Sequence, residues 1–356
     1  MAGQHYVKIQ LRRRPLEIAC LWGLAMWTTA PEMVRRDEFV FGINGHPLMQ
    51  AAYSYEVSTV DEQFELLQKL RIRWYRVDVI PDSTGLVDGS VVDLARAAKR
   101  HGITLLPVLT VRPRPAVTAM AAYAEGLGIG RGFASRYGSW FSHIEAGNEL
   151  DIWPLGSGPG GDGSTLSQYN ADTLAVVTAF LRGLSRGLKA AAPEVQVIIN
   201  SAGWRHWAFF DALKRDTVAY DVVGYHWFSD MGDIDQPVDS GMSVLDHLTS
   251  LGKDIWMTEV GRRGTVPDDP VDQGLWVGKY ARDFYGSRQV KALFVYELYE
   301  QRDFLLNSDP RDDTEAFYGI IACPDVPSSC RGRKRPKPAF DIYRRAIEDQ
   351  LGQPGQ

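Results

Sequence analysis

Short apolar runs alternate along the chain with longer segments in which apolar residues recur every three or four positions. The runs predict strands buried on both faces, and the longer segments predict amphipathic helices. The first of these helices also carries a capping-box spacing, because Thr59 precedes Glu62 by three residues. The predicted strands are 38–44, 73–80, 104–111, 141–149, 195–201, 220–228, 254–261 and 290–300. The predicted helices are 58–72, 90–103, 116–137, 169–193, 205–216, 242–252, 271–287 and 337–351.

Eight strands that are each followed by a helix predict a (β/α)8 barrel, the TIM-barrel fold of the α/β class, formed by residues 37–350. A doubly wound open sheet would need a glycine-rich fingerprint after the first strand, and "FGINGHPL" is not one. The run "GLGIGRG" at 126–132 lacks the spacing of that fingerprint and does not follow a strand, so it is interpreted as a loop. The loop 156–164, "GSGPGGDGS", lacks the Gly-Lys-Ser/Thr ending of a phosphate-binding loop.

Composition adds little to this fold prediction, but it bears on the kind of partner that the protein binds. Of the 356 residues, 45% are hydrophobic and 23% are charged, so a sizeable core is expected. The net charge is -5, and no basic cluster is interleaved with aromatic residues. The chain therefore has no feature of a nucleic-acid-binding protein.

Residues 1–36 precede the barrel and contain three arginines followed by an apolar run, 18–27. The run has the length of a signal-peptide core and is too short to span a bilayer. Pro31 makes a poor cleavage context, so a helix packed on the domain surface is an equal alternative. Association with a membrane is expected only through this leader, if it is not cleaved.

The two cysteines of "CPDVPSSC", Cys323 and Cys330, are close enough in sequence to close a short disulfide loop. Disulfides persist in oxidising compartments, which favours a secreted or periplasmic protein. Two free thiols in a cytoplasmic protein remain the alternative.

Two glutamates end predicted strands: Glu149 closes the fourth strand and Glu259 the seventh. The C-terminal ends of the strands form the active face of such a barrel. The 110 residues between the two span three strand–helix units, which predicts that they face each other across the barrel mouth. Either glutamate alone is more often a solvated or salt-bridged group. As a pair they fit glycosidic-bond cleavage, in which one carboxyl protonates the leaving oxygen and the other meets the anomeric carbon.

With Asn148-Glu149 after the fourth strand and Glu259 in "TEVG", the chain resembles the clan of retaining (β/α)8 glycoside hydrolases that includes the cellulase and xylosidase families. The resemblance covers residues 39–347. It implies that Glu149 is the acid/base, that Glu259 is the nucleophile and that Asn148 contacts the 2-hydroxyl of the sugar. The tail, "EAFYGII" followed by "RPKPAFDIY", resembles the ending of family 39.

Arg76, in "WYRVDV", matches the arginine of the second strand that steadies the nucleophile in this clan. A fixed cation beside Glu259 would keep that carboxylate ionised. The alternative is that Arg76 is a buried ion-pair partner of Asp78 or Glu145. Glu145 falls on the same strand face as Glu149 and is expected to point deeper into the barrel, where it needs a partner.

The resemblance also implies that His226 on the sixth strand and His46 after the first strand contact the sugar. The alternative for both is a structural histidine. Many clan members carry a tyrosine where this chain has Phe228, so Tyr225 or Tyr296 is expected to take its place at the nucleophile.

Four tryptophans lie in loops or strand ends of the predicted active face, and indole rings bind sugars by stacking. They suggest a cleft with several subsites, hence an oligo- or polysaccharide substrate. The four are Trp153, Trp204, Trp207 and Trp227. Trp74 and Trp256 lie within strand patterns and are expected in the core.

These features together predict a retaining glycoside hydrolase that cleaves β-linked oligo- or polysaccharides and needs no cofactor. A metal-dependent hydrolase would need clustered histidine ligands, and the seven histidines show no such pairing. A carbohydrate-binding barrel without catalysis is the alternative function, but such proteins usually lose one carboxylate, and both are present here.

Overall fold

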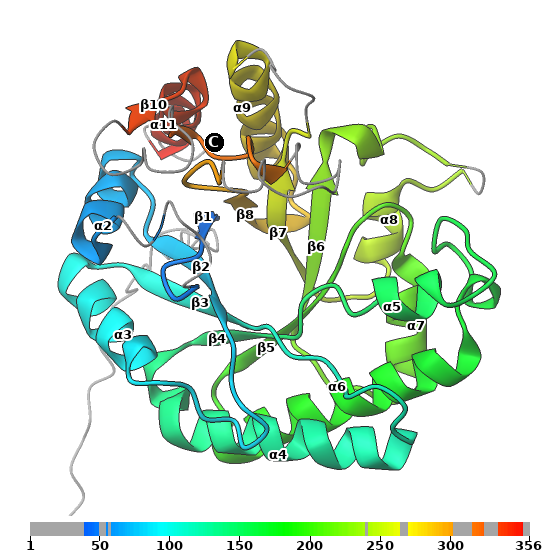
Figure 1. The fold of residues 1–356 in the computed structure, drawn as a ribbon. Helices are drawn as coiled ribbons and strands as arrows, with labels where there is room; N and C mark the ends of the chain where they lie inside the picture. Colours follow the sequence, from blue (N-terminus) through cyan, green and yellow to red (C-terminus); the bar gives the residue numbers. More distant parts are fainter. Residues whose placement is uncertain are drawn as a thin grey trace, which may run out of the picture. The chain divides into compact units, whose positions relative to one another are not determined.

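Eight parallel strands close into a barrel, in which each strand pairs with its sequence neighbours and the first pairs with the last (Figure 1). Every predicted strand forms, and the (β/α)8 prediction is confirmed. The strands are β1 Val40–Gly45, β2 Trp74–Val79, β3 Thr104–Leu109, β4 His143–Ala146, β5 Gln196–Ser201, β6 Val222–Phe228, β7 Asp254–Gly261 and β8 Val290–Val295.

Helices flank the barrel on its outside (Figure 1). The main ones are α2 Val60–Lys69, α3 Ser90–His101, α4 Ala119–Tyr137, α6 Ala171–Ala191, α7 Trp207–Arg215, α8 Val244–Thr249, α9 Pro270–Gly286 and α11 Pro338–Leu351. The short helix α5, Ile152–Gly156, follows β4, and a small antiparallel sheet pairs β9, Ile321–Ala322, with β10, Arg335–Pro336. The predicted capping box is present, since Thr59 and Glu62 cap each other's backbone at the start of α2.

The computed structural model describes residues 39–49, 55, 58–238, 241–263, 270–301, 315–323 and 334–351. The predicted leader, 1–36, lies outside these residues. Cys323 is buried and disulfide-bonded, whereas its predicted partner, Cys330, lies outside the described residues. Among the helices described, none combines the length and apolar character needed to cross a bilayer.

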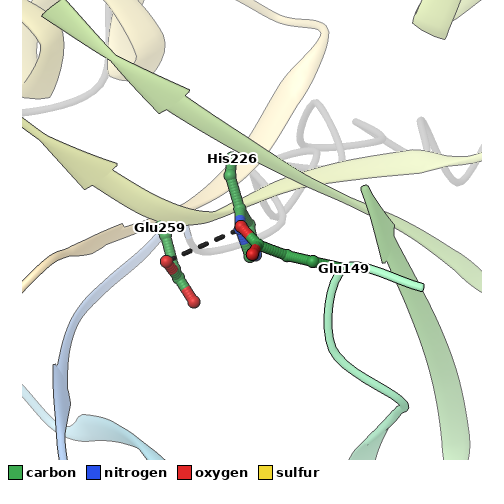
Figure 2. A group of neighbouring side chains, drawn as sticks. All are labelled: Glu149, His226 and Glu259. Atoms are coloured by element: carbon green, nitrogen blue, oxygen red, sulfur yellow. Dashed lines mark hydrogen bonds and ion pairs between the residues drawn. The ribbon is translucent and has the colours of Figure 1, made fainter. Parts of the chain in front are cut away.

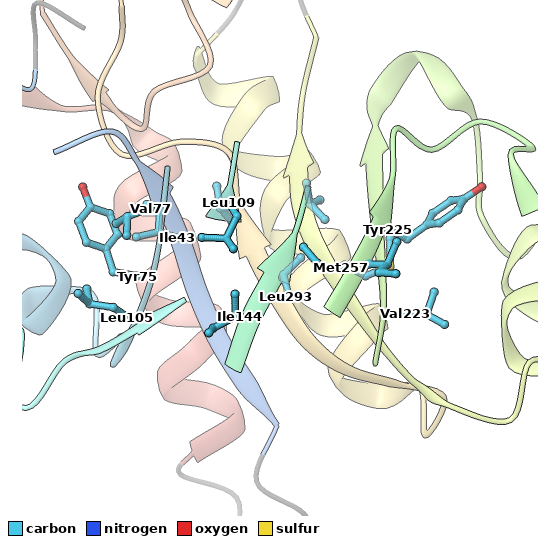
Figure 3. Close-up of a cluster of buried hydrophobic side chains, with 14 of the residues drawn as sticks. Ile43, Tyr75, Val77, Leu105, Leu109, Ile144, Val223, Tyr225, Met257 and Leu293 are labelled. Atoms are coloured by element: carbon cyan, nitrogen blue, oxygen red, sulfur yellow. The ribbon is translucent and has the colours of Figure 1, made fainter. Parts of the chain in front are cut away.

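Apolar side chains form two separate cores. One lies between the barrel wall and the helices, where the outward-facing side chains of the strands meet them (Figure 3). The other fills the barrel interior toward its N-terminal end, where the rings of Trp74 and Trp256 meet edge to face at 5.4 Å. The expectation that these two tryptophans belong to the core is confirmed. Because this inner core fills the N-terminal part of the barrel interior, polar side chains line the interior at the C-terminal ends of the strands.

The interpretation of 126–132 as a loop is wrong, because these residues continue α4. Gly126 and Gly130 of α4 face α6, and Gly183 and Gly187 of α6 face α4. A Cβ atom at Gly126 or Gly130 would come within 2.2 Å of a backbone oxygen of α6. The glycines therefore allow the two helix backbones to touch.

Candidate active site

Glu149 and Glu259 both reach the barrel interior through local departures from regular backbone. Glu149 follows the end of β4 and has a left-handed φ of 50°. On β7, Met257 pairs with Tyr225 and Glu259 pairs with His226, which leaves Thr258 as an extra residue. This bulge turns Glu259 inward although strict alternation from the inward-facing Trp256 would turn it outward.

The structure brings the two glutamates together on either side of His226 (Figure 2). One carboxylate oxygen of each glutamate and a ring nitrogen of His226 lie within 4.8 Å of one another. His226 Nδ1 is 2.7 Å from Glu149 Oε1 and 3.5 Å from Glu259 Oε2. The three groups are close enough for the charge of each to influence the protonation of the others.

His226 holds a proton at this point of the site. The side chain is fully buried. Burial lowers its pKa, but the charge of Glu259 and the hydrogen bond and charge of Glu149 raise it, and the pKa is raised overall. The raised pKa of His226 favours its protonated form, which can donate a hydrogen bond from Nδ1 to Glu149.

Arg76 organises the other side of the site. Its buried guanidinium donates hydrogen bonds to four side chains: from Nε to Glu145 at 2.5 Å, from Nη1 to Asn44 at 2.7 Å and to Glu259 at 2.6 Å, and from Nη2 to Asn148 at 2.9 Å. Both interpretations of Arg76 thus hold, since it is the cation beside Glu259 and also the partner of Glu145. The prediction that Glu145 needs a buried partner is confirmed.

The charge of Glu259 depends on its neighbours. Burial raises the pKa of Glu259, whereas the cations His226 and Arg76 lower it, and Glu149 raises it again. The net shift is upward. The two cations beside Glu259 therefore offset part of the effect of burial and favour the ionised form.

His46, predicted to contact the sugar, lines the same pocket as an imidazolium ion. Its Nδ1 bonds Asp78, and its Nε2 lies 3.1 Å from the buried Glu297. Burial lowers the pKa of His46, but Glu297 and Asp78 raise it to about 10. Asp78 is thus the partner of His46, not the ion-pair partner of Arg76.

The glutamates line a pocket of about 150 Å³ at the barrel mouth. Six of its lining residues were predicted: His46, Arg76, Asn148, Glu149, Glu259 and Tyr296. Four were not assigned to the site from the sequence: Asp78, Phe228, Arg263 and Glu315. Tyr296 lines the pocket together with Glu259, and Phe228, where many clan members carry a tyrosine, supplies an apolar wall.

The predicted contact with the sugar is wrong for three residues, which lie outside the barrel interior. Tyr225 and Trp227 are buried on the outer side of β6, because His226 between them faces inward and side chains alternate along a strand. Their polar groups bond backbone oxygens of loops outside the barrel interior. Trp207 opens α7 and stacks on His247 of α8 with ring centres 4.1 Å apart.

The other two predicted tryptophans are exposed. Trp153 in α5 is 36% exposed and Trp204 after β5 is 41% exposed. Both follow strand ends on the mouth side of the barrel, although neither lines the pocket. They remain candidates for contact with sugars beyond it.

Glu149, His226 and Glu259 are also a group that could offer three ligands to a metal ion within the described part of the chain. However, Glu259 already bonds Arg76 at 2.6 Å, and Glu149 already bonds His226. A metal ion between them would lie beside the guanidinium and would be repelled by it. The arrangement fits proton exchange between the three side chains better than metal binding.

Glu315 is an unexpected carboxyl in the pocket wall. Burial raises its pKa, and the charges of Glu297, Glu259 and Glu149 raise it further, while Arg263 opposes them. The result is a pKa of about 7, against an ordinary value of 4.5. Glu315 therefore gains a proton on folding in the pH range between these two values.

This shift predicts a pH-dependent effect of Glu315→Gln on stability. Because the folded protein binds a proton more tightly than the unfolded chain does, stability falls as pH rises from about 4.5 to about 7. We expect the variant to exceed the wild type in free energy of unfolding by roughly 1–3 kcal/mol at pH 8, and to equal it at pH 4. Urea unfolding at both pH values measures this, with Glu65→Gln on the exposed face of α2 as control. A difference that is the same at both pH values would contradict it.

No protein-family model matches the sequence, and no curated protein sequence matches it. The barrel is nevertheless similar to solved structures. A family 1 β-glucosidase from Thermotoga maritima has a TM-score of 0.61 and 12% identity, over 88% of this chain and 98% of that chain. The virulence factor SghA from Agrobacterium tumefaciens has a TM-score of 0.58 and 13% identity, over 87% of this chain and 96% of that chain.

These likenesses show the fold. At such identities they show nothing finer, and the resemblance to family 39 stays a prediction. Of the two neighbours themselves, the Thermotoga enzyme has been solved with glucoimidazole and SghA with its substrate analogue salicin.

Proposed function

We propose that the protein is a retaining glycoside hydrolase that cleaves β-linked oligo- or polysaccharides. The observation that carries the proposal is the approach of Glu149 and Glu259, whose nearest oxygens lie within 4.8 Å. Retaining enzymes hold their two carboxyl groups roughly 5–5.5 Å apart, whereas inverting enzymes leave about 6.5–9.5 Å for a water molecule. The ligands of the structural neighbours, glucoimidazole and the substrate analogue salicin, support a carbohydrate substrate.

In the first step Glu259 attacks the anomeric carbon while Glu149 gives its proton to the glycosidic oxygen. The bond between that carbon and oxygen breaks, the alcohol leaves, and an ester joins the sugar to Glu259. In the second step Glu149, now a carboxylate, takes a proton from water. The water oxygen attacks the anomeric carbon, Glu259 is released, and the sugar keeps its original configuration.

The surroundings of the two glutamates support these roles. The Glu259 side chain is 9% exposed and bonds Arg76, which favours the charged form that a nucleophile needs. The Glu149 side chain is 29% exposed, and its Oε1 lies 2.7 Å from His226 Nδ1. It is open to the water that the second step consumes, and the raised pKa of His226 keeps a proton beside it.

Asn148 is oriented for the 2-hydroxyl contact that the resemblance implies. Its Oδ1 accepts hydrogen bonds from Arg76 at 2.9 Å and from Asn200 at 3.1 Å. With the oxygen so occupied, the NH2 group of Asn148 is the end left to donate to a ligand in the pocket that it lines. A hydrogen bond of this kind to the 2-hydroxyl strengthens in the transition state.

Trp153 and Trp204 are proposed to bind sugar units beyond the cleavage point, on the side of the acid/base. We expect Trp153→Ala and Trp204→Ala each to raise KM for an oligosaccharide about 5-fold, since a stacked aromatic ring contributes about 1 kcal/mol. KM for a short aryl monoglycoside should stay within about 2-fold. Trp140, 37% exposed at the opposite end of the barrel, provides the control Trp140→Ala. Equal effects on both substrates would argue against this subsite.

Export of the protein is proposed with it, because Cys323 is disulfide-bonded. Export also fits an enzyme that acts on polysaccharides. Fractionation of the native host, with the redox state of Cys323 determined by mass spectrometry, tests this. Recovery in a reducing compartment with a free thiol would contradict it.

The function is tested by incubating the protein with β-linked glucans, mannans, xylans and bacterial exopolysaccharides and following the anomer first released by NMR. We expect the β-anomer to appear first and to mutarotate afterwards. Initial release of the α-anomer would exclude double displacement. Binding without any release of reducing ends would indicate the alternative, a carbohydrate-binding barrel without catalysis.

A further inference from the structure

Asn200 of β5 lies beneath the acid/base and uses both ends of its amide there. The side chain is 2% exposed. Its Oδ1 accepts a hydrogen bond from the backbone N–H of Glu149 at 2.7 Å. Its Nδ2 donates to Glu145 at 2.5 Å and to Asn148 at 3.1 Å. One buried amide thus contacts the backbone of the acid/base, the neighbouring amide and the carboxylate that anchors Arg76.

The contact with Glu149 supports an unfavourable backbone conformation. Glu149 has a φ of 50°, in the left-handed region that residues with a Cβ atom seldom adopt. Such a conformation persists only where the surrounding structure holds it, and it is common at functional sites. The hydrogen bond from the Glu149 N–H to Asn200 is a contact of this kind, because it fixes the backbone from which the carboxyl projects.

The contact with Asn148 fixes a second group. Asn200 and Arg76 are the two donors to Asn148 Oδ1, so together they set which end of that amide faces the pocket. Asn148 and Glu149 belong to one loop, whereas Glu259 is held from the other side by Arg76. Asn44 supports that other side, since its Oδ1 accepts from Arg76 and its Nδ2 donates to the backbone oxygen of Thr258.

We propose that Asn200 is a positioning residue for acid/base catalysis, which holds Glu149 and Asn148 in place against the nucleophile. The proposal rests on the proposed function. Its consequence is a dependence on the leaving group, because a poor leaving group needs the proton from Glu149 and an activated phenol does not. A residue with a merely structural role would affect both kinds of substrate alike.

The test compares the wild type with Asn200→Ala on aryl β-glycosides of one sugar. We expect kcat/KM of the variant to fall about 50-fold or more on the phenyl glycoside and less than about 3-fold on the 2,4-dinitrophenyl glycoside. Asn44→Ala, which disturbs the nucleophile side, should lower both by similar factors. Asn200→Ser, which places a hydroxyl at this position, is the second variant if the alanine variant does not fold, and it should give the same pattern with a smaller loss.

The outcomes separate the two proposals. If the wild type hydrolyses the glycosides and neither Asn200 variant discriminates between leaving groups, the positioning role is wrong while the proposed function stands. If the wild type hydrolyses no glycoside in the series or in the polysaccharide panel, the proposed function is wrong, and the role of Asn200 is wrong with it.

Discussion

Replacing Glu259 with glutamine lowers kcat on an aryl β-glycoside by a factor of about 10⁴ or more, as expected for the loss of the nucleophile of a covalent mechanism. The amide of glutamine has the same shape but cannot form the ester intermediate. Activated substrates should not restore the rate, because both good and poor leaving groups need the attack by Glu259. Steady-state kinetics with the phenyl and the 2,4-dinitrophenyl glycosides measure this loss.

A measurement of the free energy of unfolding distinguishes this loss of kcat from misfolding of the variant. Because burial raises the pKa of Glu259, its charge is held at a cost in the folded protein, and the glutamine variant should be at least as stable as the wild type above neutral pH. Azide added to Glu259→Ala provides a second check. We expect azide to occupy the vacated space and to give the α-glycosyl azide, identified by NMR. A variant that keeps more than about 1% of the wild-type kcat would be incompatible with Glu259 as nucleophile.

The barrel could be predicted from the sequence because its strands and helices have different periodicities. The ends of the strands are where chemistry is expected in this fold, and Glu149 and Glu259 were found on that basis. Strand alternation, applied strictly, would also have excluded Tyr225 and Trp227. Once His226 faces the interior, its two neighbours must face the helices.

Alternation alone would have misplaced Glu259. Trp256 lies in the inner core and Glu259 in the pocket, although their separation of three residues puts them on opposite faces of a regular strand. The bulge at Thr258 reconciles the two, and no residue type in "DIWMTEVG" marks it. The resemblance to the clan therefore predicts the inward direction of Glu259, whereas strand periodicity does not.

The α4–α6 contact was visible in the sequence but was interpreted wrongly. Gly126 and Gly130 are four residues apart, as are Gly183 and Gly187, and residues at this spacing share one face of a helix. Matching pairs on two helices indicate a close contact between them. Comparison with a nucleotide-binding fingerprint alone predicts a loop at the first pair, and the structure contradicts this because both glycines lie in α4.

The remaining pocket residues differ in how far they could be predicted. Asp78 follows Arg76 by two residues on β2, so it shares the inward face of that strand. Arg263 and Glu315 lie beyond the ends of β7 and β8, where no periodicity fixes the direction of a side chain. Asn200 is on the inward face of β5, but its role depends on the conformation of Glu149, which a sequence does not reveal.

Replacing Glu149 with glutamine should give a loss that depends on the leaving group, in contrast to the loss at Glu259. Without the acid, kcat/KM for the phenyl glycoside should fall about 10²–10⁴-fold, while the 2,4-dinitrophenyl glycoside should keep most of its value. Hydrolysis of the ester intermediate also needs Glu149, as the base that activates water. The intermediate should therefore accumulate on the activated substrate, which lowers kcat and KM together and gives a burst of phenol at the start of the reaction.

Azide distinguishes the roles of the two glutamates within one experiment. Added to Glu149→Ala, it should attack the ester intermediate without needing a base and give the β-glycosyl azide, the opposite anomer to that expected from Glu259→Ala. His226→Phe offers a matched comparison, because it leaves both carboxyls but removes the ring that forms a hydrogen bond with Glu149. Its loss should grow with the basicity of the leaving group, as at Glu149, but should be smaller. If both glutamate variants give the same anomer of the azide, or if Glu149→Gln loses equal factors on both substrates, then Glu149 does not supply the proton, and the pairing of an acid with a nucleophile across the pocket is wrong.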